Sequence, residues 1–122
     1  MPSHILIVED EESERLLYEE VFVEEGYEVE LAGDADQALD MLRARRPDLV
    51  VLDINMPGKD GLDLLREIMA IDHKLPVVLN TAYSAYQDNF MSWSAAAYVV
   101  KSSDTTELLQ TVRNVLAGET SK

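Results

Sequence analysis

The fold is decided by the segment Asp48-Leu49-Val50-Val51-Leu52-Asp53, an apolar run that ends on a carboxylate. A loop rich in turn formers follows at residues 54–61, and then the amphipathic run Leu62 to Met69. This order predicts a buried strand, a loop and a helix. In open parallel α/β sheets, ligands and chemistry lie at the carboxyl ends of the strands. Asp53 is therefore a candidate functional residue, although a single Asp at such a place is more often a turn residue or a helix cap.

Five apolar runs recur along the chain, with helical patterns between and after them. The runs lie at residues 5–8, 28–31, 49–52, 77–80 and 96–100. The helical stripes are Leu17, Tyr18, Val21 and Phe22; Ala38, Leu39 and Leu42; Leu62, Leu65 and Met69; Tyr86, Phe90 and Trp93; and Leu108, Val112, Val115 and Leu116. Strict alternation of strands and helices predicts one parallel sheet with helices on both faces. The run at 28–31 alternates polar and apolar residues and indicates an edge strand, whereas the continuous apolar runs 49–52 and 77–79 indicate the centre.

Helix boundaries are also marked in the sequence. Capping boxes are predicted at Asp34 to Gln37, Ser84 to Gln87 and Asp104 to Glu107. Gly118 follows the last apolar stripe and predicts the end of the final helix.

Composition narrows the class of protein. The 122 residues, 47% of them apolar, suit one domain over residues 1–122, with a short polar tail at 119–122. Without cysteine there is no disulfide framework and no thiolate metal site. No apolar run near the start is long enough for a signal peptide or a membrane span, so we expect a soluble, cytoplasmic chain. The net charge of −14, without clustered Lys and Arg, argues against direct nucleic-acid binding. We also expect no membrane partner.

Three other predicted strand ends carry polar residues that suit chemistry. Glu9 and Asp10 follow the first run, Thr81 follows the fourth and Lys101 follows the fifth. Each has an ordinary structural role as an alternative, since Thr81 could bond the backbone and Lys101 could be a loop lysine. The combination of two acids, an acceptor Asp, a hydroxyl and an ammonium is far more specific than any one of them.

This order and spacing resemble the receiver domain of bacterial response regulators, over roughly residues 4 to 117. The resemblance implies an α/β, flavodoxin-like fold: a single doubly wound five-stranded parallel sheet in the order 2-1-3-4-5, with five helices. It implies a phosphorylation-dependent switch in which Asp53 accepts a phosphoryl group from a sensor histidine kinase or a phosphotransfer protein. The chain would catalyse only its own phosphoryl transfer and dephosphorylation.

The resemblance also implies a role for each remaining site residue. Asp10 and Asp53 would bind Mg²⁺ (or Mn²⁺) directly, Asn55 through its backbone carbonyl, and Glu9 through water. Lys101 and Thr81 would each bind a phosphoryl oxygen, and Tyr98 is the switch aromatic that moves with Thr81. Asn55 and Tyr83 flank the phosphoryl group and tune its hydrolysis. Mg²⁺ also suits the residues themselves, because acids packed this closely repel one another and a hard divalent cation relieves the repulsion.

The output is expected on the face formed by the fourth helix, the fifth strand and the fifth helix. Tyr86, Phe90 and Trp93 give the fourth helix more aromatic surface than its length needs, and aromatic residues are enriched at recognition surfaces. Since no basic patch is present, the partner should be a protein: a kinase, a phosphotransfer protein, an output protein or a second copy of this chain.

Two points stay open at this level. The alternative function is an interaction module of receiver fold that no longer uses phosphorylation. The family usually has Pro after its Lys, whereas Ser102 follows Lys101 here. We predict a trans Lys101–Ser102 peptide, because a cis bond before a residue other than proline costs about 2.5–4 kcal/mol.

A calcium-binding EF-hand at Asp53 is rejected, since its twelfth position is Leu64 rather than Glu.

Overall fold

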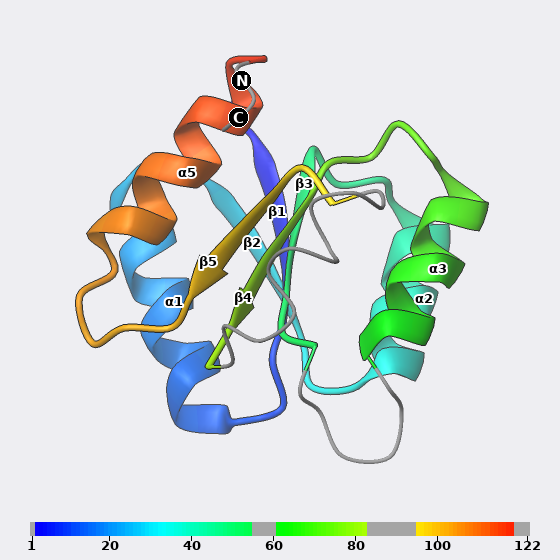
Figure 1. The fold of residues 1–122 in the computed structure, drawn as a ribbon, viewed down its shortest axis with the longest axis horizontal. Helices are drawn as coiled ribbons and strands as arrows, with labels where there is room; N and C mark the ends of the chain where they lie inside the picture. Colours follow the sequence, from blue (N-terminus) through cyan, green and yellow to red (C-terminus); the bar gives the residue numbers. More distant parts are fainter. Residues whose placement is uncertain (1, 55–60, 83–94, 119–122) are drawn as a thin grey trace.

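The computed structural model describes residues 2–54, 61–82 and 95–118 (Figure 1). In chain order the elements are β1 (His4–Val8), α1 (Glu12–Glu24), β2 (Glu28–Ala32), α2 (Ala35–Ala44), β3 (Leu49–Leu52), α3 (Gly61–Ile71), β4 (Val77–Thr81), β5 (Ala97–Val100) and α5 (Thr106–Leu116). Every predicted apolar run forms a strand. Four of the five predicted helices are observed, and the fourth, with Tyr86, Phe90 and Trp93, lies outside the described residues.

The five strands form one parallel sheet in the order β2-β1-β3-β4-β5. This is the order of flavodoxin-like folds, and it confirms the fold class. β2 lies at an edge and is the least buried of the strands, as its alternating sequence predicted. β3 lies at the centre and is buried along its whole length.

Two hydrophobic clusters cover the two faces of the sheet, because successive side chains of a strand point to opposite sides. Leu6 and Val8 of β1 belong to the cluster beneath α2 and α3. Ile5 and Ile7 of the same strand belong to the cluster beneath α1 and α5. Figure 1 shows these two helix pairs on opposite sides of the sheet.

The buried stripe of α1 is narrower than predicted. Tyr18 and Phe22, one helical turn apart, are buried against the sheet, and Val21 packs beside them. Leu17, which we assigned to the same stripe, is 43% exposed, so that part of the prediction was wrong. Each residue turns about 100° around a helix axis, and this step carries Leu17 off the face that Tyr18 and Phe22 occupy.

The helix boundaries follow the predicted signals with small displacements. Asp34 caps α2 by accepting a hydrogen bond from the Gln37 backbone N–H at 2.8 Å, but the Gln37 side chain bonds Gly33 rather than Asp34. Asp104 is not the N-cap of α5, because Thr105 occupies that place. The Asp104 carboxylate instead accepts from the backbone N–H and hydroxyl of Thr106, a local turn that competes with capping.

The far end of α5 agrees with the prediction. Gly118 follows the last helical turn with φ of 86°, a backbone conformation that favours glycine. No helix in the described part of the chain is long and apolar enough to cross a membrane.

Candidate functional site

The parallel register brings the ends of β1 and β3 side by side. Val8 pairs with Leu52, so Glu9 and Asp53 begin the loops at the same edge of the sheet. The Asp53 backbone N–H donates to the Val8 carbonyl at 3.0 Å and extends the pairing by one residue. Asp53 is thereby fixed next to the acids of the first loop, as the strand order implied by the resemblance requires.

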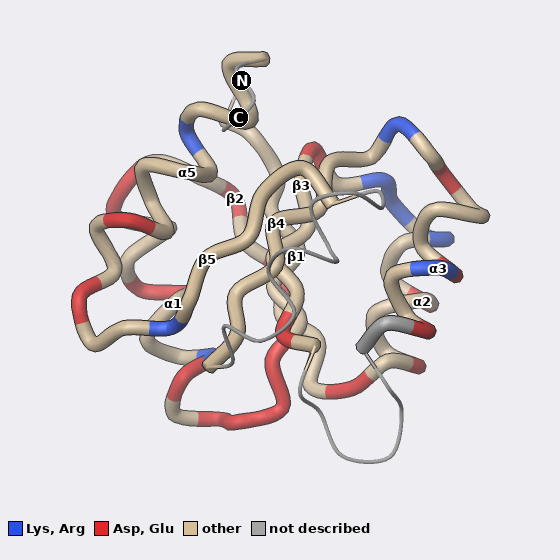
Figure 2. Tube along the Cα trace, in the orientation of Figure 1, with Lys and Arg blue, Asp and Glu red and all other residues tan. Residues whose placement is uncertain are grey.

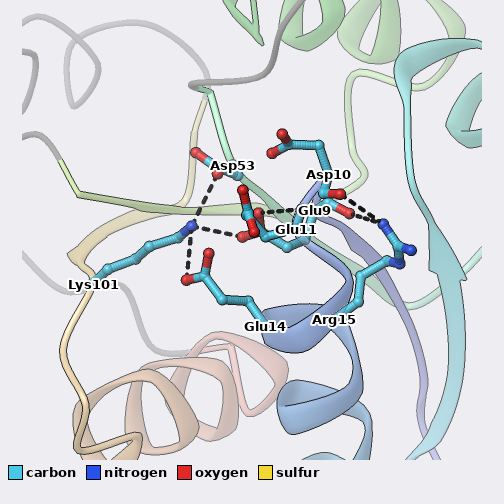
Figure 3. Close-up of polar contacts among 7 residues, drawn as sticks. All are labelled: Glu9, Asp10, Glu11, Glu14, Arg15, Asp53 and Lys101. Atoms are coloured by element: carbon cyan, nitrogen blue, oxygen red, sulfur yellow. Dashed lines mark hydrogen bonds and ion pairs between the residues drawn. The ribbon is translucent and has the colours of Figure 1, made fainter.

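The pairing of β4 with β5 places Thr81 and Lys101 together in the same way. Thr81 pairs with Val100, and the Lys101 backbone N–H donates to the Thr81 carbonyl at 2.7 Å. Thr81 is fully buried. The Lys101 side chain then reaches past the end of β4 towards the acids (Figure 3).

Three acids form a compact cluster at this edge. Glu9, Asp10 and Asp53 each offer one carboxylate oxygen, and these oxygens lie within 4.8 Å of one another. Glu9 is 1% exposed and Asp53 is 4% exposed, while Asp10 is partly open to solvent. Figure 2 shows further acidic residues on the loop that leads from β1 into α1. The cluster therefore concentrates negative charge where water is largely excluded.

Lys101 is the cation that faces this charge. Its Nζ lies 2.7 Å from Glu9 Oε1, 3.0 Å from Asp53 Oδ2 and 3.1 Å from Glu14 Oε1 (Figure 3). Its side chain is 14% exposed, so these ion pairs are only weakly screened by solvent. One ammonium group thus joins β1, β3 and α1 at the carboxyl end of the sheet.

The protonation of the site follows from burial and charge. Burial raises the pKa of the Glu9 carboxyl from its ordinary value of 4.5 to about 7; the charge of Asp53 also raises it, and the hydrogen bond from Lys101 opposes the rise. Burial alone would lower the pKa of the Lys101 ammonium, but its bonds to Glu9 and Asp53 outweigh that effect and raise it. Lys101 therefore remains charged at physiological pH.

The donor set fits a hard divalent cation. The three clustered groups are all carboxylates, and carboxylate oxygens are ligands that Mg²⁺ prefers. Asp10, the most open of the three, leaves the cluster accessible from solvent. Asn55, whose carbonyl the resemblance assigned to the metal, lies outside the described residues.

The structure describes some of the remaining residues that the sequence analysis singled out. Tyr98 pairs with Leu79 in the sheet and is 9% exposed. The described part of the chain contains no cis peptide bond, so the Lys101–Ser102 peptide is trans, as predicted. Tyr83 lies outside the described residues.

Two residues near the cluster were missed by the sequence analysis. The Arg15 guanidinium donates to the backbone carbonyls of Glu9 and Asp10 at 2.8 and 3.0 Å, and it passes close to Gly33, where an added Cβ would lie 3.0 Å from Nη1. Glu14 contacts Lys101 directly. A signal existed for Arg15, which is the only Lys or Arg among the first 30 residues of the sequence. Glu14 had none, since its acidic run resembles an ordinary solvated helix start.

A family model for the response regulator receiver domain matches residues 5–113 of this chain. The chain belongs to the response regulator receiver domain family. It is 45% identical over 83 residues to sporulation initiation phosphotransferase F of Bacillus subtilis, covering 68% of this chain and 67% of that protein. It is 36% identical over 118 residues to the response regulator MprA of Mycolicibacterium vanbaalenii, covering 95% of this chain and 51% of MprA. This receiver domain therefore spans about half the length of MprA.

Solved structures agree with the family assignment. The response regulator TrrA of Thermotoga maritima, in complex with Mg²⁺-BeF, has a TM-score of 0.87 and 41% identity, covering 93% of this chain and 98% of TrrA. TrrA in complex with the histidine kinase ThkA gives a TM-score of 0.86. The chain is thus a receiver domain of two-component signalling, a signalling domain rather than a conventional enzyme.

Replacing Lys101 should test its role in the charge balance of the site. We expect Lys101→Met to lower the free energy of unfolding by about 3 kcal/mol, because it leaves buried carboxylates without their cation. Loss of the cation raises the folded-state pKa of Glu9 further above its ordinary value. The folded state then binds more protons than the unfolded state, so stability falls as pH rises.

The deficit of Lys101→Met should therefore be largest above pH 7 and should shrink towards about pH 5. Urea unfolding at both pH values in the presence of EDTA measures it. Lys74→Met removes the same charge from an exposed loop residue and should change stability little at either pH. An equal deficit for the two variants would contradict this account of Lys101.

Proposed function

We propose that this receiver domain is a phosphorylation-dependent switch whose acceptor is Asp53. The single observation that supports this most is the placement of the Asp53 carboxylate, which is 4% exposed, lies 3.0 Å from the Lys101 ammonium and shares a cluster with Glu9 and Asp10. The donor would be the phosphohistidine of a sensor histidine kinase or of a phosphotransfer protein. The relative TrrA, which was solved with the histidine kinase ThkA, supports this choice.

In the proposed transfer, a carboxylate oxygen of Asp53 attacks the phosphorus atom. An O–P bond forms and the P–N bond of the donor breaks, and its electron pair returns to the histidine nitrogen. Lys101 then donates to one phosphoryl oxygen as a point charge, and the Thr81 hydroxyl donates to another. The product is an acyl phosphate on Asp53.

We infer that Mg²⁺ (or Mn²⁺) assists this transfer. Asp10 and Asp53 would hold the ion directly, Glu9 would act through water, and Asn55 would offer its backbone carbonyl. The bound ion would neutralise charge on the acids and on the incoming phosphoryl group. The Mg²⁺-BeF complex of TrrA supports the same chemistry for this chain.

We further propose that the signal is read on the face formed by β5, α5 and the predicted fourth helix. Phosphorylation would draw Thr81 towards the phosphoryl group and favour the conformation in which Tyr98 is buried. Asn55 and Tyr83 would tune how fast the phosphoryl group hydrolyses. The partner would be an output protein or a second copy of the chain, without direct nucleic-acid binding. Because the donor acts in the cytoplasm, we place the switch there as well.

Asp53→Asn should abolish covalent labelling by a small phosphodonor in the presence of Mg²⁺, because the amide is a far poorer nucleophile than the carboxylate. Mass spectrometry with the modified residue mapped measures this, and circular dichroism verifies the fold. Asp63→Asn, on the exposed surface of α3, is the matched control and should label like the unmodified chain. Labelling that persists in Asp53→Asn would refute the assignment. No labelling of the unmodified chain would favour the interaction module that does not use phosphate.

Mg²⁺ should stabilise the unphosphorylated chain by about 2.7 kcal/mol at 100 times its dissociation constant. Asp10→Ala should remove most of this gain, since it deletes a ligand. Asp40→Ala, an exposed site on α2, is the control and should keep the gain. Chemical denaturation with and without Mg²⁺ makes the comparison. Equal responses of the two variants would mean that the ion binds elsewhere.

Binding of beryllofluoride, a mimic of the phosphoryl group, should change the emission of Trp93, the only tryptophan. Thr81→Ala should weaken this change, because it removes the hydroxyl proposed to transmit the signal. Amide exchange over residues 82–105 provides a second readout. If neither readout responds to the mimic, the proposed output face is wrong.

A further inference from the structure

Glu14 supplies Lys101 with a carboxylate that the proposed transfer does not use. Glu14 lies in the first turn of α1, and its Oε1 is 3.1 Å from Lys101 Nζ. Its side chain is 34% exposed, compared with 2% for Glu9 and 5% for Asp53. It is thus the most hydrated of the three partners.

The local structure holds Glu14 in this position. Arg15, the next residue, binds the carbonyls of Glu9 and Asp10 and ties the first turn of α1 to the end of β1. One residue corresponds to about 100° of rotation around the helix. Glu14 therefore leaves α1 on a different side from Arg15 and meets Lys101, as Figure 3 shows.

Three carboxylates share the ammonium group of Lys101. A lysine ammonium has three N–H donors, and Lys101 faces three carboxylates at 2.7, 3.0 and 3.1 Å. The Glu14 contact is an ion pair, so a phosphoryl oxygen that approaches the ammonium competes with Glu14 for its charge. Glu14 is the most solvent-accessible of the three carboxylates and can bind water instead, so it is the partner released at least cost.

We propose that Glu14 is a positioning residue that holds Lys101 in the unphosphorylated chain and releases it to the phosphoryl group. This inference rests on the proposed function, since it concerns the same Lys101 ammonium. Its consequence is that Glu14 competes with the phosphoryl group for Lys101. The strength of this competition sets how readily the site accepts a phosphoryl group or a mimic of it.

Three variants separate the contact from the charge. Glu14→Gln removes the charge and weakens the contact, whereas Glu14→Asp keeps the charge and withdraws the carboxylate by one methylene. Glu12→Gln removes one charge from the same helical turn at an exposed residue, for which the structure records no contact with Lys101. The probe is beryllofluoride at saturating Mg²⁺, followed by ¹⁹F NMR.

Glu14→Gln should bind beryllofluoride about fivefold more tightly than the unmodified chain, as expected for loss of a partly exposed ion pair. Glu14→Asp should also bind more tightly, and Glu12→Gln should change the affinity less than about twofold. In a Lys101→Met background, Glu14→Gln should have no effect, because its partner is absent. An effect that persists in that background, or equal affinities of Glu14→Gln and Glu12→Gln, would overturn the proposal.

A second measurement does not require the phosphoryl mimic. The ¹⁵N signal of the Lys101 ammonium, recorded without beryllofluoride, should shift in Glu14→Gln and not in Glu12→Gln. If the unmodified chain binds beryllofluoride and labels at Asp53 but this signal does not shift, the Glu14 proposal fails and the proposed function stands. If the signal shifts but the unmodified chain does not bind beryllofluoride, the proposed function fails, and the competition for Lys101 fails with it.

Discussion

Repulsion between like charges at one edge of the sheet is the constraint on which the site depends. Glu9 and Asp53 are nearly inaccessible to water, and Asp10 lies beside them. Carboxylates placed in this way would drive one another towards protonation. Burial raises the pKa of Glu9, and the charge of Asp53 adds to this rise. The short contacts of Lys101 oppose both effects.

The sheet order makes this arrangement reachable. β3 lies between β1 and β4, so its carboxyl end has the acids that follow β1 on one side and the end of β4, where Thr81 is the last residue, on the other. Lys101 comes from the next strand and spans the gap with its long side chain. A shorter side chain at that place would not reach the acids and would leave them without a counter-charge. Lysine therefore suits this position by its length as well as by its charge.

The same charge balance connects structure to signalling. In this site several carboxylates contact one ammonium group, that of Lys101. The site is therefore sensitive to any group that competes for the ammonium or for the carboxylates. In the proposed function, a phosphoryl group would compete for Lys101 and a divalent ion would compete for the acids. The buried backbone bonds from Asp53 to Val8 and from Lys101 to Thr81 keep both sides in place while such exchanges occur. Receiver domains are signalling domains. At the carboxyl end of the sheet, a chemical change at one residue would alter contacts with residues from several strands.

The sequence by itself determined the strands, most helix boundaries and the positions of Glu9, Asp10, Asp53, Thr81 and Lys101 at strand ends. These features follow from local periodicity and from apolar runs that stop at polar residues. Leu17 was assigned to the buried face in error, because a stripe in the sequence does not fix how far a helix rolls on its sheet. Only the tertiary structure decided that Arg15 would clamp the first loop and that Glu14 would meet Lys101. The Glu14–Lys101 contact joins residues far apart in the chain, whereas Arg15 reaches carbonyls only five and six residues away. Both contacts depend on how the first turn of α1 sits against the end of β1, which no local pattern encodes.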